Sequence, residues 1–162
     1  MSNLPFRIGF GYDIHRFASD RRLVLGGVDI PSVLGLEGHS DADCLTHAIA
    51  DAILGACGLA DIGHQFPNTD ASIEGIDSQI ILKKAADLAA EKGYEIGNID
   101  SCIIAEKPKI SPHIDAIKEV LSKTLTIPVD SICIKATTQE RIGALGAGEG
   151  IAAHAVCLIN KV

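Results

Sequence analysis

The strongest constraint on the fold of this chain is a run of apolar residues at helical spacing between residues 40 and 58. Within "SDADCLTHAIADAILGACG" the apolar positions recur every three or four residues, at Leu45, Ala48, Ile49, Ala52, Ile53 and Ala56. Ser40 is the expected N-cap, with Asp43 three residues later, and Gly58 ends the run. The pattern predicts an amphipathic helix that must bury one face against another element.

The remaining segments predict one domain built around one mixed sheet. Alternating or β-branched stretches predict strands over 9–17, 22–30, 98–107, 131–138 and 151–161. Two further helices are expected over 78–93 and 111–125, with Ser78 and Ser111 as N-caps. The order ββααβαββ, with no repeat or low-complexity linker, predicts a single α/β (α+β) domain over 1–162 with helices packed on the sheet.

Two glycine-rich features fall between these elements. Gly26-Gly27 marks a turn or bulge inside the segment 22–30. The sequence "GALGAGEG" at 143–150 looks like a phosphate loop, but the dinucleotide fingerprint opens a helix and this stretch leads into a strand. A turn with unusual backbone angles is the favoured interpretation, and an independent phosphate role is the alternative.

Charge and composition limit the classes of partner that the chain is expected to bind. The net charge is −7 and the Lys and Arg residues are scattered, so the basic stripe of a nucleic-acid binder is missing. Such a chain binds an anionic small molecule only through a local device, such as a metal, a helix N-terminus or placed lysines. No C-x-x-C pair, basic leader or run of about 20 apolar residues is present. We therefore expect a soluble, cytoplasmic protein with no nucleic-acid and no membrane partner.

The stretch "GFGYDIHRF" at 9–17 contains half of a metal site. In a strand, residues two apart project from the same face, so Asp13 and His15 lie together. We expect the alternating bulky residues to fill the core from the opposite face. A carboxylate and an imidazole are ordinary Zn²⁺ ligands, but a stable site needs a third protein group. The alternative is a strand whose wet face carries Asp and His by chance.

His47, inside the first helix, is the candidate for that third ligand. Asp43 and Asp51 lie one turn before and one turn after it, and either carboxylate is placed to hold the ring, as carboxylates commonly do for ligating histidines. Asp13, His15 and His47 would then leave one open coordination position. His39 and Ser40 stand at the expected helix start, where free N–H groups favour an anion. A metal beside an anion site suggests phosphate chemistry.

Five stretches together resemble one enzyme family. They are "GYDIHRF", "GHSDADCLTHAIADAILGA", "ADIGHQFPNTD", "AEKPKISPHI" and "KATTQERIGALGAGEGIAAHA". The chain resembles the 2-C-methyl-D-erythritol 2,4-cyclodiphosphate synthases of the non-mevalonate isoprenoid pathway along nearly its whole length. The resemblance implies a homotrimer with sheets around a central channel and with active sites between neighbouring subunits.

The resemblance also implies roles for individual residues. It makes Asp13, His15 and His47 the ligands of one Zn²⁺ per chain, in agreement with the spacing argument, and Glu140 the ligand of a second cation, Mg²⁺ or Mn²⁺. His39 and Thr138 would be catalytic donors to the phosphoryl oxygens. Around the methylerythritol phosphate, the implied contacts are Asp13, Ile14, His15, His39, Ser40, Asp61, Ile62, Gly63, Phe66, Pro67, Asn68, Thr69 and Asp70. From the adjacent subunit, the implied contacts to cytidine and diphosphate are Ala105, Glu106, Lys107, Pro108, Lys109, Ile110, Ser111, Ala136, Thr137, Thr138, Gln139 and Glu140.

The implied reaction is an intramolecular phosphoryl transfer. The 2-phosphate of 4-diphosphocytidyl-2-C-methyl-D-erythritol 2-phosphate attacks the β-phosphorus, closes the cyclic diphosphate and expels CMP. Because the attacking oxygen is already anionic, the protein has mainly to fold the substrate and neutralise charge. Two rival interpretations keep the same three ligands. One is a metal-dependent phosphohydrolase with water in the open position, and the other is a trimeric metal-binding or regulatory module without chemistry.

Three positions depart from the family pattern. Asn68 stands where many members have Asp, Ala147 where many have Arg, and Ala144 where some have Phe. Ala144 and Ala147 occupy positions that border the trimer channel in the family. An anion anchor for isoprenoid diphosphates is therefore expected to be weak in this chain.

Overall fold

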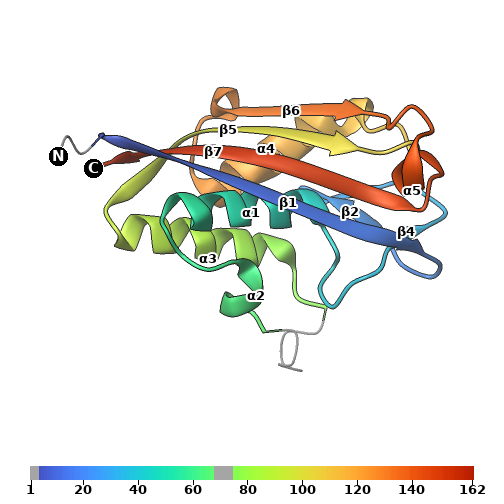
Figure 1. Ribbon diagram of the computed structural model, residues 1–162, viewed down its shortest axis with the longest axis horizontal. Helices are drawn as coiled ribbons and strands as arrows, with labels where there is room; N and C mark the ends of the chain where they lie inside the picture. The colour runs from blue at the N-terminus through green and yellow to red at the C-terminus, as the bar shows by residue number, and fades with distance from the viewer. Residues whose placement is uncertain (1–3, 68–74) are drawn as a thin grey trace.

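A five-stranded mixed sheet runs through the molecule, with its long helices packed against it, and a separate sheet has two strands (Figure 1). The computed structural model describes residues 4–67 and 75–162. The strands are β1 (Phe6–Ala18), β2 (Leu23–Leu25), β3 (Val28–Ile30), β4 (Gly35–Leu36), β5 (Tyr94–Ile104), β6 (Ile132–Thr137) and β7 (Gly150–Lys161). The helices are α1 (Cys44–Ala56), α2 (Ile62–Gln65), α3 (Ser78–Glu91), α4 (Ile114–Leu125) and α5 (Gly143–Gly146).

The sheet has the strand order β4-β1-β7-β5-β6, so the mixed α/β fold that the sequence predicts is confirmed. β7 lies between β1 and β5 and is antiparallel to both, whereas β5 and β6 are parallel neighbours joined by the crossover helix α4. Parallel neighbours end at the same edge of a sheet. The N–H of Ala105 after β5 accordingly donates to the carbonyl oxygen of Thr137 at the end of β6, at 3.0 Å.

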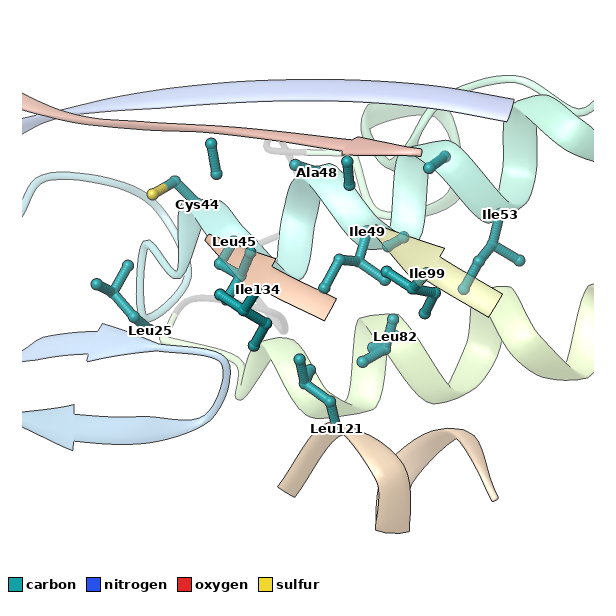
Figure 2. Close-up of a cluster of buried hydrophobic side chains, with 14 of the residues drawn as sticks. Leu25, Cys44, Leu45, Ala48, Ile49, Ile53, Leu82, Ile99, Leu121 and Ile134 are labelled. Carbon is teal, nitrogen blue, oxygen red and sulfur yellow. The ribbon is translucent and has the colours of Figure 1, made fainter. Parts of the chain in front are cut away.

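Helix α1 lies at the centre of the core. Figure 2 shows Leu45, Ile49 and Ile53 of α1 turned toward Leu82 of α3 and Ile99 of β5. All five side chains are fully buried. Burial of one such side chain contributes about 1.5 to 3 kcal/mol to folding, so this cluster fixes where α1 lies on the sheet.

The burial of the two faces of β1 is the reverse of the expectation. The bulky residues are exposed, with relative accessibilities between 39% and 62%, at Phe6, Ile8, Phe10, Tyr12 and Ile14. The core-facing positions are Gly9 and Gly11, in line with Asp13 and His15. The expectation that the bulky residues fill the core is wrong because α1 lies directly on the strand backbone. A Cβ on Gly9 would fall 1.8 Å from the carbonyl oxygen of Ala52.

The starts of three helices also differ from the expectation. α1 is capped by Asp43 rather than Ser40, and α3 by Asp77 rather than Ser78. The third expected helix begins with a 3₁₀ turn over Ser111–His113, and no side chain caps it. The starts of α1 and α3 each offer more than one short polar residue as a cap, so tertiary partners decide which one is used.

The loops contain structure that the sequence pattern did not indicate. α2 lies within the expected loop 60–77, and α5 lies within the glycine-rich segment 143–150. The unusual backbone angles expected for that segment are confirmed at Gly143 and Gly148, with φ of +70° and +77°. Gly26 and Gly27 form the turn between β2 and β3, with positive φ at both residues. In the described ranges 4–67 and 75–162, no helix is both long and apolar enough to cross a membrane.

Candidate functional site

A strand and a helix bring three metal-binding side chains together. Asp13 and His15 project from the core-facing side of β1, and His47 comes from the first turns of α1. The Oδ2 atom of Asp13 lies 2.9 Å from Nδ1 of His47 and 3.0 Å from Nε2 of His15. The three ligand atoms all lie within 4.8 Å of one another. The structure thus brings together the three residues that the sequence singles out.

The far side of the His15 ring fixes which nitrogen faces this centre. Nδ1 of His15 lies 2.6 Å from the carbonyl oxygen of Glu37. Because a carbonyl only accepts hydrogen bonds, Nδ1 carries a hydrogen, and Nε2 is the nitrogen whose lone pair beside Asp13 is available to a metal ion or a proton. Lone pairs that converge in this way need a cation or a proton among them. One carboxylate and two imidazoles with an open fourth position fit Zn²⁺.

The directions of the pKa shifts in the triad also favour positive charge between its three side chains. Burial acts to raise the pKa of Asp13, but hydrogen bonds and charge from His15 and His47 outweigh it and lower the pKa well below its ordinary value. Burial acts to lower the pKa of His15, but the hydrogen bond and charge of Asp13 outweigh it and raise the pKa. A cation at the centre would supply the charge that these groups favour.

The other edge of the His47 ring meets two hydroxyl groups. Nε2 of His47 lies 2.8 Å from Oγ of Ser78 and 3.2 Å from Oγ of Ser40. The expectation that Asp43 or Asp51 holds this ring is wrong, because both carboxylates bind backbone groups elsewhere in the described chain. The sequence did not indicate that Ser78 contacts His47, because a serine at the start of an expected helix is interpreted as its N-cap.

Asp43 and Asp51 instead fix the backbone around the site. Asp43 accepts the N–H groups of Gly26 and Gly27, at 2.9 and 2.7 Å, and so joins the start of α1 to the β2–β3 turn. Asp51 accepts the N–H of Ile62 at 2.8 Å, which holds the start of α2 against α1. Burial raises the pKa of both carboxyl groups, and the donated hydrogen bonds oppose that effect.

A pocket of about 220 Å³ opens beside the triad. Its other lining residues are His39, Ser40, Ile62, Gly63, Phe66, Ile76 and Ile81. Most of the expected contacts of the methylerythritol phosphate therefore meet here. Ile14 does not, because its side chain lies on the outer face of β1, and Asp61 is an exposed residue that caps α2. Pro67 is exposed, and Asn68, Thr69 and Asp70 lie outside the described residues.

The segments that follow β5 and β6 line a second hollow of about 1220 Å³. Its polar lining comes from Ser32, Glu106, Lys107, Lys109 and Arg141, and Pro108, Gly146, Ala147 and Gly148 complete that side. Ala105 and Ile110 are buried, and Ser111 begins the following 3₁₀ turn. This hollow shares no lining residue with the pocket of the triad. Within one chain, the expected cytidine contacts Glu106 to Lys109 thus line a different hollow from the triad.

Glu106, which lines the second hollow, also binds the loop after β6. Its carboxylate accepts the N–H groups of Gln139 and Arg141, at 2.9 and 3.2 Å. In the same loop the hydroxyl of Thr138 donates to Oε1 of Glu140, at 2.8 Å. Ala136 and Thr137 are exposed at the end of β6. This loop gathers the residues expected to meet the diphosphate.

Comparison with known proteins places this architecture in a family. The model of the YgbB family matches residues 6–160. The chain belongs to the YgbB family. A curated relative from Synechocystis sp., a 2-C-methyl-D-erythritol 2,4-cyclodiphosphate synthase, is 57% identical over 155 residues, which are 96% of each protein. The synthase of the same name from Chloroherpeton thalassium is 53% identical over 156 residues, 96% of this chain and 99% of that protein.

Solved structures of the YgbB family share the fold. The CDP complex of IspF from Plasmodium falciparum superposes with a TM-score of 0.86 at 38% identity, covering 99% of each chain. The bifunctional IspDF from Campylobacter jejuni gives a TM-score of 0.94 at 39% identity, covering 97% of this chain and 42% of that one. The β-sheet and helices described above are thus the family fold.

Proposed function

We propose that this chain converts 4-diphosphocytidyl-2-C-methyl-D-erythritol 2-phosphate to 2-C-methyl-D-erythritol 2,4-cyclodiphosphate and CMP, a phosphorus–oxygen lyase reaction of the non-mevalonate pathway. The observation that carries the proposal is the convergence of Asp13, His15 and His47 at a pocket that also contains His39 and Ser40. Curated relatives that match over nearly their whole length bear the name of this synthase, and two related structures hold CDP.

The proposed metal ligands follow from the donor sets. Asp13, His15 and His47 would hold one Zn²⁺, and Glu140 would hold Mg²⁺ or Mn²⁺ together with substrate phosphates, since Mg²⁺ commonly takes only one or two protein carboxylates. When bound, the two cations supply positive charge to the phosphoryl oxygens.

The residues of the chain then have few chemical tasks. The attacking 2-phosphate oxygen is already anionic, so no strong general base is required. His39 is exposed beside the triad and would donate to a phosphoryl oxygen, while Ser40 and the backbone of Ile62 and Gly63 would orient the methylerythritol phosphate. The hydroxyl of Thr138 would donate to the diphosphate on the leaving side.

A second chain would supply Thr138, because the residues that line the pocket of the triad do not include Thr138 or any other residue of the loop after β6. The resemblance to the synthases implies a homotrimer, and we propose that the loop after β6 of one subunit meets the triad of the next. The outer face of β1 and β7 supports self-association, since Ile8, Phe10 and Val156 expose 62%, 61% and 41% of their surfaces there. Monomeric proteins rarely leave so continuous an apolar face in water.

The proposal is tested by supplying the cytidyl substrate with Zn²⁺ and Mg²⁺ and following CMP by chromatography. We expect CMP and the cyclic diphosphate in equal amounts, and neither with His47→Ala. Release of inorganic phosphate would favour the phosphohydrolase, which uses the open position of the triad for water. A chain that binds zinc but neither binds nor turns over the nucleotide would be a metal-binding module.

A further inference from the structure

Ser78 connects the metal centre to a second carboxylate. Its side chain is fully buried at the first residue of α3, with Oγ 2.8 Å from Nε2 of His47. The Ser78 hydroxyl also lies in hydrogen-bond contact with Oδ1 of Asp41. The other carboxylate oxygen of Asp41 accepts the backbone N–H of Ser78, at 3.0 Å.

The hydrogens in this chain of contacts can be assigned from donor and acceptor chemistry. Asp41 receives the N–H groups of Ser78 and Asp43, so its carboxylate acts as an acceptor. The Ser78 hydrogen then points to Asp41, and Oγ of Ser78 can only accept from the Nε2–H of His47. The His47 ring therefore carries a hydrogen on Nε2, which leaves Nδ1, 2.9 Å from Asp13, as the nitrogen available to a metal ion.

We propose that Ser78 and Asp41 are positioning residues that fix the tautomer and the orientation of His47 for metal binding. Hydrogen bonds of this kind raise the basicity of a ligating imidazole and hold its plane. The Ser78 bond is shorter than that from Ser40, whose Oγ lies 3.2 Å from the same nitrogen and also accepts the N–H of Ala42. Ser78 is thus the principal partner of Nε2.

The same contacts fasten the wall of the pocket. The N–H of Gly75 donates to the carbonyl oxygen of His39, at 2.7 Å, and the N–H of Asp41 donates to that of Ile76, at 3.2 Å. Together with the Ser78 bonds, these contacts join segment 75–78 to segment 39–41. The start of α3 therefore positions the ligand His47 and the neighbouring residues His39 and Ser40 at once.

Ser78→Ala tests the proposal because it removes the hydroxyl and leaves the backbone bond to Asp41 in place. We expect the dissociation constant of zinc, measured by competition with a chromogenic chelator, to rise about 10 to 100-fold. The matched control is Ser101→Ala, since Ser101 is also buried but donates to the carbonyl oxygen of Cys133 on the neighbouring strand. Its zinc affinity should stay at the wild-type value. Thermal unfolding of both metal-free variants reports the structural cost of losing a buried hydroxyl.

A spectroscopic readout separates positioning from general destabilisation. In the zinc-loaded wild type, the Nε2–H proton of His47 should give a slowly exchanging NMR resonance, and Ser78→Ala should speed its exchange while Ser101→Ala leaves it unchanged. The inference rests on the proposed zinc site, so the wild type is titrated first. If the wild type did not bind zinc, the proposed metal site itself would be wrong. Tight wild-type binding with an unchanged dissociation constant in Ser78→Ala would overturn the positioning role alone.

Discussion

Gly11 of β1 lies directly beneath Ala48 of α1, so close that a Cβ on the glycine would fall 1.9 Å from the carbonyl oxygen of Ala48. Strand and helix can approach this closely only where the strand has no side chain. The contact sets the height of α1 over β1. It thereby brings His47, one residue before Ala48, to 2.9 Å from Asp13 on the strand.

Gly11→Ala should therefore destabilise the fold and weaken the metal site together. Forcing a methyl group into a packed core costs about 1 to 3 kcal/mol, and here the obstacle is backbone. Chemical denaturation measures the loss. Gly55→Ala is the matched control, because a Cβ on Gly55 has no neighbour closer than 3.8 Å and alanine is the better helix former. Equal stability of the two variants would contradict the close-contact account.

Asp51→Ala should raise the KM for the cytidyl substrate while leaving zinc affinity unchanged. The carboxylate holds the N–H of Ile62 rather than the His47 ring, so its loss frees the start of α2 beside the pocket. Asp51→Asn retains an oxygen that accepts this hydrogen bond and should be closer to wild type. A fall in zinc affinity with an unchanged KM would restore the role in which Asp51 holds His47.

Some of this architecture follows from local pattern and some does not. The period of two in β1 correctly predicts that Asp13 and His15 share one face of the strand. The helical period of α1 places His47 on the helix that packs against that face. Sequence alone does not show which face of β1 is buried, since bulky apolar residues ordinarily mark the core. Ser78 was missed because its partner His47 lies 31 residues away, on another helix.

Replacing Phe10 with lysine should disrupt self-association. Phe10 lies 61% exposed on the outer face of β1, next to Tyr12 and Val156, and a charge there would be buried in the proposed interface. Sedimentation velocity should show a trimer for the wild type and smaller species for Phe10→Lys. Ile80→Lys on α3, where the side chain is 56% exposed, is the control and should remain trimeric. A wild-type monomer would refute the shared-site proposal.

Mixed trimers test whether one active site takes residues from two chains. His47→Ala lacks a proposed metal ligand, and a Lys109→Ala, Thr138→Ala double variant lacks one group from the other hollow and one from the loop after β6. Co-refolding the two inactive proteins should rebuild some sites in which both sets are intact, and activity should return. If mixed trimers form and remain inactive, each site belongs to a single chain.

The proposed reaction requires the 2-phosphate of the substrate itself to be the attacking group, and turnover in water enriched in ¹⁸O shows whether it is. Intramolecular attack breaks the bond between the β-phosphorus and the bridging oxygen, which leaves with CMP, so water contributes no oxygen to either product. We predict ³¹P signals of the cyclic diphosphate and CMP without an isotope shift. An ¹⁸O-shifted phosphate signal in CMP or in a methylerythritol bisphosphate would show attack by water and would contradict the account.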